Sequence, residues 1–232
     1  MGNMKIKYCF RLPDDTEEVF NLELDAESVE LVDNMSESPP EWARLGFHQC
    51  PNCPLSKQTH PNCPLMLNLV DIVSRFDHIL SYDELNMEVF TEERCISSHT
   101  TAQRGLSSLM GIVIGSSGCP HTVCFKPMVR FHLPLSSEEE TIYRAASMYL
   151  LAQYFLKKKG RTADFELNGL EQIYKNIHIV NTTIAKRLRA ASKTDSSVNA
   201  IIMLDMYAKA MPHAIEESLE EIQYLFTPYL KD

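Results

Sequence analysis

Cysteine and histidine recur at a fixed spacing in one short segment of the chain. Residues 50–65, CPNCPLSKQTHPNCPL, contain Pro-Asn-Cys-Pro-Leu twice, ten positions apart. The first copy follows Cys50 and the second follows His60, so the potential ligands are Cys50-x-x-Cys53 and His60-x-x-Cys63. Two residues between ligands allow one tight turn to direct both side chains at a single ion. The segment therefore predicts a metal site.

A structural zinc ion is the direct interpretation, because tetrahedral zinc takes four thiolate or imidazole ligands. Cys50, Cys53, His60 and Cys63 provide such a Cys3His set, and His48 is an alternative ligand. The Pro-Asn between the ligands fits two turns, since Pro fixes φ and Asn tolerates unusual backbone angles. Such a site would contribute folding free energy directly. We expect the protein to use it for regulation or for binding a partner.

A [4Fe-4S] cluster is the competing interpretation. Cys50, Cys53, Cys63 and Cys119 are each followed by Pro, and Cys-Pro is common among cluster ligands. The protein would then be an iron–sulfur or thiol redox protein, in which His60 is not a ligand. The CPNCPL segment alone resembles the cysteine loops of iron–sulfur DNA glycosylases and nucleases, although it lacks their ligand spacing and their enzyme core. Thiols that bind no metal are the third interpretation.

The segment SSGCPHT, residues 116–122, is a second candidate site. If Pro120 begins a helix, Cys119 stands at its N-cap, where the helix dipole lowers the pKa of a thiol. His121 could stabilise that thiolate or serve as an alternative metal ligand. Cys119 and His121 are thus the weak candidates for catalysis, with Cys119 as a reactive thiol or the fourth cluster ligand. The simpler alternative is a packed cysteine between two helices.

Two arginines, Arg104 and Arg130, are candidates for binding an anion, because a guanidinium beside a helix start can hold a carboxylate or phosphate. Ion pairing with the many Asp and Glu residues is the simpler alternative. Asp205, within the apolar segment IIMLDMYAKAM, is either a buried partner for one of these arginines, in a structural ion pair, or an acid for catalysis. The chain has no GxGxxG, GxxxxGKS/T, HExxH, GxSxG or kinase motif, so it indicates no reaction.

Composition limits the partners. Apolar residues make up 44% and charged residues 23% of the 232 residues, as in soluble globular proteins. The net charge of −9 argues against broad attraction to nucleic acid or an anionic membrane. No apolar run is long enough to span a membrane. Seven cysteines without a secretory signal favour reduced thiols in the cytoplasm, and a protein partner or a second copy remains open.

The periodicity of apolar residues along the sequence predicts the strands and helices that must position these residues. Residues 4–12 and 19–25 alternate between apolar and polar types, which predicts a β-hairpin. Further short strands are expected at Val29–Val32 and at 86–95. Ser136 and Glu139 predict a capping box, Asp195 a helix cap, and Pro212 a helix break. Apolar stripes and end signals predict helices at 65–79, 101–118, 136–160, 170–191 and 195–210.

The fold class expected from this order is α+β: a small N-terminal antiparallel β element, a metal-binding Cys/His loop and a mainly helical bundle. We expect a single domain over 1–232, with the β element at 1–45, the loop at 46–64 and the helical body at 65–232. Lys157–Lys193 carries nine basic residues against three acidic ones. A solvated helix face is the simplest interpretation of that excess.

The sequence resembles an uncharacterised family of bacterial cytoplasmic proteins across nearly its whole length. The segments that carry this resemblance are FHQCPNCPL, TTAQRGLSSLMG, SGCPHT, RFHLPLSSEEETIYRA and DSSVNAIIMLDMYAKAMP. The resemblance implies a bacterial, soluble origin. It implies no activity and no catalytic roles, so the metal interpretation depends on the residues alone.

Overall fold

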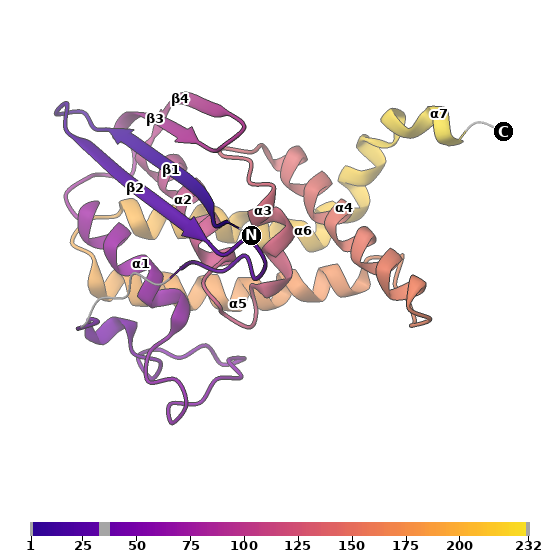
Figure 1. Cartoon of the computed structure of the whole chain (residues 1–232), viewed down its shortest axis with the longest axis horizontal. Coiled ribbons are helices and arrows are strands. Elements are labelled where there is room, and N and C mark those ends of the chain that lie inside the picture. Colours follow the sequence, from indigo (N-terminus) through magenta and orange to yellow (C-terminus); the bar gives the residue numbers. More distant parts are fainter. Residues whose placement is uncertain (1, 33–37, 231–232) are drawn as a thin grey trace.

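The computed structural model describes residues 2–32 and 38–230, and for residues 213–218 it describes the backbone only. A small antiparallel sheet packs against one end of a group of helices (Figure 1). The predicted α+β class, with a helical bundle as its main body, is confirmed. None of the described helices combines the length and the apolar character needed to cross a membrane.

Four strands form the sheet in the order β2-β1-β3-β4. The predicted hairpin is confirmed as β1 (Met4–Arg11) paired with β2 (Glu17–Leu24). On its other side β1 pairs with β3 (Glu84–Phe90), which pairs with β4 (Cys95–Thr101). The sheet therefore extends beyond residues 1–45, where the sequence places the β element, and the single domain remains a prediction.

The strand expected at Val29–Val32 is wrong. In this segment only Leu31 forms an isolated bridge, to Leu24. Val29 has a φ of 56°, a left-handed conformation that interrupts extended backbone. The segment therefore pairs with β2 at one residue, Leu31, and does not form a strand.

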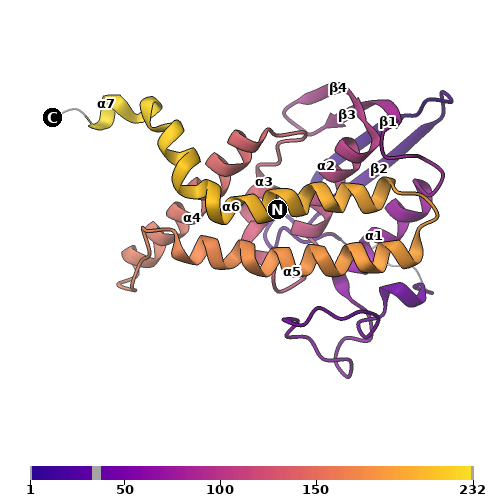
Figure 2. The same ribbon diagram turned by 180° about the vertical axis from the view of Figure 1, so that it is seen from behind.

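The remaining elements are helical. The α-helices are α1 (Pro64–Arg75), α2 (Ala102–Gly115), α3 (Lys126–Arg130), α4 (Glu138–Lys158), α5 (Asn168–Ala191), α6 (Ser196–Glu221) and α7 (Thr227–Leu230). The 3-10 helices are η1 (Glu41–Ala43), η2 (Val123–Phe125) and η3 (Gln223–Phe226). Helices α5 and α6 lie side by side as a long hairpin (Figure 2), while η3 and α7 extend away from the body.

The core lies between the sheet and the helices. Alternation along β1 buries Ile6, Tyr8 and Phe10 on one face. The Phe10 ring meets Phe76, at the end of α1, edge to face with ring centres 5.2 Å apart, an arrangement that aromatic rings favour. Helix α2 and parts of α5 and α6 complete this core. A second, smaller apolar cluster joins α4 to α5 and α6.

Two helix-end predictions are corrected. The capping box of α4 is formed by Ser137 and Glu140, one residue later than predicted, because the helix begins at Glu138. Helix α6 continues through Pro212, where a break was predicted. A proline removes one backbone hydrogen bond, and in a helix of 26 residues the turns on both sides persist. Asp195 stands directly before α6, and its carboxylate accepts from the N–H and the hydroxyl of Ser81, so the predicted cap remains a prediction.

Candidate functional site

Four cysteine thiols from three separate segments lie close together. Cys50 and Cys53 belong to the loop before α1, Cys63 is the residue that precedes α1, and Cys119 follows α2. Burial raises the pKa of Cys50, Cys63 and Cys119, and the charges of neighbouring thiols in the same set raise it further. We call Cys50, Cys53, Cys63 and Cys119 the four-thiol group. Its members are the cysteines that are followed by Pro.

The histidines of the predicted site lie in different surroundings. His60 is exposed, and its Nδ1 is 2.9 Å from the Thr59 hydroxyl. The His48 ring packs edge-on against Phe47 with ring centres 4.8 Å apart. His121 donates from Nε2 to the main-chain oxygen of Asn52 over 2.7 Å. His121 therefore connects the segment after α2 to the turn between Cys50 and Cys53.

Only one of the two predicted turns is present. The N–H of Cys53 donates to the carbonyl of Cys50 over 3.0 Å, which closes the first turn. In the second copy of the repeat, the N–H of Cys63 donates instead to the carbonyl of Ala43 over 2.8 Å. Asn62 pairs with Arg44 in an isolated bridge, which keeps this copy extended. The equal spacing in the sequence therefore does not give equal local geometry.

Within the described ranges, no three His, Cys, Asp or Glu side chains are placed to hold one metal ion as they stand. The four-thiol group is thus a set of neighbours without a formed coordination shell. Rotation of a cysteine between its staggered χ1 wells moves Sγ while the backbone stays fixed. A shared ion would therefore require at least such side-chain changes, and the His121–Asn52 hydrogen bond already joins the Cys119 segment to the Cys50–Cys53 turn.

The N-terminus of α1 acts on Cys63. Cys63 is the N-cap residue and Pro64 is the first helical residue, a position that proline favours. The main-chain N–H groups of Leu65 and Met66 lower the pKa of the Cys63 thiol, in opposition to the larger effect of burial. Free N–H groups at a helix start favour a negative charge, so this end of α1 favours the thiolate form of Cys63.

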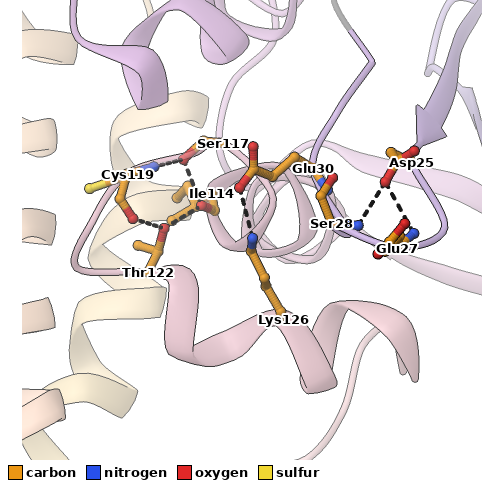
Figure 3. Close-up of polar contacts among 9 residues, drawn as sticks. All are labelled: Asp25, Glu27, Ser28, Glu30, Ile114, Ser117, Cys119, Thr122 and Lys126. Atoms are coloured by element: carbon orange, nitrogen blue, oxygen red, sulfur yellow. Dashed lines mark hydrogen bonds and ion pairs between the residues drawn. The ribbon is translucent and has the colours of Figure 1, made fainter.

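The turn that carries Cys119 is held by two hydroxyls (Figure 3). The Ser117 hydroxyl donates to Ile114 O over 2.8 Å and accepts from the Cys119 N–H over 3.3 Å. The Thr122 hydroxyl lies 2.9 Å from Ile114 O and 3.1 Å from Cys119 O. Gly118 has a φ of 77°, which glycine adopts without strain. These contacts fix the position of Cys119 relative to the end of α2.

The prediction that Cys119 occupies a helix N-cap is wrong. Residues 120–122 form a turn, and η2 begins after Thr122. Burial raises the pKa of Cys119 to about 12, the opposite of the direction expected for an activated thiol. Lys126, just beyond this turn, pairs with Glu30 over 2.7 Å (Figure 3). Cys119 is therefore held in a packed, anchored turn.

A buried arginine organises the loop that carries Cys50. Arg187 of α5 is 2% exposed and donates to main-chain oxygens of four residues over 3.1–3.3 Å: Trp42, Arg44, Leu45 and His48. It forms no ion pair with any residue that the structure describes. Its charge lowers the pKa of Cys50 and of Cys63, against the larger effect of burial. A buried cation thus stands beside the four-thiol group.

The same face of α5 supplies further contacts. Thr183 lies one turn before Arg187, and its hydroxyl lowers the pKa of Cys50. The Asn52 side-chain amide donates to the Asn176 side-chain oxygen over 3.3 Å. Positions 176, 183 and 187 are seven and four residues apart, which places them on one side of a helix. Helix α5 is therefore the surface against which the Cys50–Cys53 turn packs.

The candidate anion-binding residues are separated. Arg104 is exposed on α2 and lines a cavity between the helices, whereas Arg130 is exposed on α3 with Nη1 3.2 Å from Met4 Sδ. Asp205 binds neither of them. It lies 2.7 Å from His178 Nδ1 and 3.0 Å from Lys209 Nζ, which corresponds to the predicted structural ion-pair role.

Arg187 is the site residue that sequence reasoning missed. A usable signal exists in the stripe of apolar residues on α5. Arg187 follows Ile184 by three positions and precedes Leu188, so it falls on the buried face of the helix. A charged residue at such a position is expected to have a specific partner.

The comparison with protein families covers almost the whole chain. No curated protein and no solved structure matches the chain. One family model matches residues 6–227, which include the four-thiol group and every described helix except α7, of which only the first residue is matched. The chain therefore belongs to the family described as "Domain of unknown function (DUF6901)".

Proposed function

We propose that this protein is a metal-binding protein whose metal centre is held by the four-thiol group. The observation that carries the proposal is Arg187, a buried cation with no anionic partner in the described ranges, beside four thiols. An uncompensated buried charge is costly. Four thiolates around a divalent ion have a net charge of about −2, which would compensate Arg187.

An iron–sulfur cluster is the centre we propose for these thiols. Structural zinc sites are commonly built from two closely spaced pairs of ligands, and here only Cys50 and Cys53 form a pair. Cys63 and Cys119 are single cysteines from other segments, and all four are followed by Pro, as is common for cluster ligands. Zinc held by the same four thiolates is the second candidate, and the Cys3His zinc site with His60 is the third.

The centre would join parts of the chain that are distant in sequence. It would connect the loop 46–62, the N-terminus of α1 and the turn after α2, all beside α5. Because ligand thiols must be deprotonated, metal binding would also release protons from thiols whose pKa is raised by burial. We propose that the metal centre has a structural or regulatory role, and redox chemistry is the alternative role. We also propose a cytoplasmic location, where thiols remain reduced.

The first test is to purify the protein without oxygen and to measure its metal, sulfide and visible absorption. Iron and sulfide with a broad band near roughly 400 nm support the cluster. One zinc per chain without visible absorption supports the zinc site on the same thiols. Folded protein that retains neither metal, even after reconstitution with iron and sulfide or with zinc, contradicts the proposal.

Matched variants identify the ligands. Cys119→Ser is expected to reduce metal content at least tenfold, whereas Cys124→Ser is expected to leave it unchanged. Cys124 is five residues further on and outside the four-thiol group, with its thiol 3.7 Å from the His121 carbonyl. Equal metal content in the two variants excludes Cys119 as a ligand.

His60→Ala separates the two ligand sets. If four thiolates hold the metal, this variant retains the wild-type content, because the His60 side chain is exposed and contacts Thr59. If the variant loses the metal while Cys119→Ser retains it, the Cys3His zinc site replaces our proposal. Circular dichroism spectra of both variants show whether each one is folded.

A further inference from the structure

A cavity of about 200 Å³ lies between the helices, apart from the four-thiol group. Residues from α2, α3, α4, α5 and α6 line it, and much of its wall is apolar, including Ile112, Val129, Ile177 and Leu204. A cavity of roughly 150 Å³ is enough to bind a molecule the size of benzene. The cavity is therefore large enough for a single ring that carries a short substituent.

Three polar side chains in its wall are free of hydrogen bonds to other described residues. Ser107, Tyr174 and Asn181 are 6%, 5% and 3% exposed, and each lines the cavity. None of the three side chains forms a hydrogen bond with another residue in the ranges the structure covers. Their polar atoms are not among the fully enclosed, unpaired ones, so water or a ligand in the cavity can pair with them.

A guanidinium without an anionic partner completes the wall. The Nη2 of Arg144 donates to the carbonyls of Met128 and Phe131 over 2.9 and 3.0 Å. Its Nε and Nη1 form no hydrogen bond with a described residue, and no described carboxylate pairs with Arg144. The nearby Glu140 carboxylate accepts from the Ser137 N–H in the capping box of α4. Arg144 thus has donors available for an anion.

Other charged and titratable groups near the cavity do not neutralise Arg144. His132 also lines the cavity, and its Nε2 is hydrogen-bonded to the Tyr8 hydroxyl, which suits a neutral imidazole. Arg104 adds a second positive charge at the wall. Burial lowers the pKa of Arg144, and the negative charge of Glu140 opposes this effect, so Arg104 and Arg144 stand against one nearby carboxylate. With an apolar wall, accessible hydrogen-bonding groups and this excess of positive charge, the cavity favours an anion that is mostly apolar.

We propose that this cavity binds a small monocarboxylic acid with an apolar body of about one ring, its carboxylate on Arg144. A guanidinium suits a carboxylate because both groups are planar and can form two parallel hydrogen bonds. Ser107, Tyr174 and Asn181 would bind polar substituents of the acid. The proposal does not depend on the metal centre, since no member of the four-thiol group lines the cavity.

Calorimetric titration with benzoate, phenylacetate and isovalerate tests the proposal, with the neutral amide of each acid as its control. At least one acid is expected to bind one per chain, and its amide is expected to bind at least tenfold more weakly. If none of the acids gives saturable binding at millimolar concentration, the proposal is wrong. It is also wrong if acid and amide bind equally, because Arg144 then recognises no charge.

Two variants locate the site. Arg144→Met is expected to weaken binding of the acid at least tenfold, whereas Arg130→Met, a change at an exposed arginine that does not line the cavity, should have no effect. Gly111→Leu is expected to block binding by filling the cavity. A Cβ at Gly111 would meet only Leu204, at 3.8 Å, so there is room for a side chain to start there, and circular dichroism checks that the variant is folded. Wild-type affinity in folded Gly111→Leu protein places the ligand elsewhere and overturns the proposal.

Discussion

Arg187 shows how one side chain can position a segment that has little regular structure of its own. The loop before α1 contains only the short η1, and its carbonyls at Trp42, Arg44, Leu45 and His48 accept from the Arg187 guanidinium. Hydrogen bonds from a charged donor are stronger than those between neutral groups. The orientation of the loop, and with it that of Cys50, therefore depends on a residue almost 140 positions later.

Arg187→Met should lower the free energy of unfolding by on the order of 3 kcal/mol, because several buried carbonyls lose their donor. Arg189→Met is the matched control. Arg189 is exposed on the same helix, and surface changes of this kind usually stay within about 0.5 kcal/mol. Urea denaturation measures both. Similar free energies for the two variants would show that the loop is held by other contacts.

His132 gives a pH dependence of stability. Burial lowers the pKa of His132 from 6.5 to about 3, so the unfolded chain binds one more proton between these values. Stability therefore falls as the pH decreases below about 6.5, by at most about 1.4 kcal/mol per pH unit. Because part of the side chain remains accessible, the slope is expected to be smaller than this limit.

The measurement compares the wild type with His132→Gln between pH 6.5 and 5, above the range in which most carboxylates titrate. The glutamine oxygen can still accept from the Tyr8 hydroxyl, but it cannot bind a proton in this range. The wild type should lose more stability than the variant as the pH falls. Parallel slopes would show that His132 titrates normally in the folded protein.

At the scale of elements, sequence periodicity predicts most helices and the first hairpin, because these patterns arise from neighbours along the chain. Strand β4 could not be predicted in this way. Its sequence, CISSHTT, is mostly polar, and only Thr100 is buried. It becomes a strand because it pairs with the edge of β3. This pairing depends on the tertiary structure and leaves no pattern in the sequence of β4 itself.

The repeat around Cys50 and His60 illustrates the same limit for the site. Spacing predicts which residues can share a turn, and the Cys50–Cys53 turn is present. Spacing does not reveal that Asn62 pairs with Arg44 or that Cys119 lies beside the other thiols. Those contacts depend on how α2 and α5 pack, so the choice between His60 and Cys119 needs the three-dimensional structure.

The capping box of α4 provides a prediction at this scale. Ser137→Ala should destabilise the protein by about 1 kcal/mol, since the side chain that accepts from the Glu140 N–H is lost. Ser136→Ala removes a hydroxyl that contacts only Thr141, over 3.1 Å, and should cost less. Thermal denaturation of the pair checks this. A larger effect of Ser136→Ala would show that Ser136, as predicted from the sequence, is the capping residue of α4.

For the whole molecule, the proposed metal couples the loop 46–62 to the stability of the core. A ligand that binds only the folded state stabilises it by about 2.7 kcal/mol at a concentration of a hundred times its Kd. Removal of the metal should therefore lower the melting temperature. It should also make the loop 46–62 the first site of proteolysis, because the metal ligands of that loop would be free.

The Cys119→Ser variant serves as the reference for this experiment. Its melting temperature and cleavage pattern should respond little to the treatment that removes the metal from the wild type. Mass spectrometry of the fragments identifies the cleaved segment. Initial cleavage in the C-terminal part of both proteins, irrespective of metal, would show that the loop is held without an ion.

The contact between α5 and the Cys50 loop has a consequence for biosynthesis. Cys50, Cys53 and Cys63 leave the ribosome long before Cys119, and Arg187 emerges later still. While the nascent chain is incomplete, its first three thiols lack both their fourth neighbour and the helix surface that orients them. We therefore expect insertion of the proposed metal only after Arg187 has been synthesised.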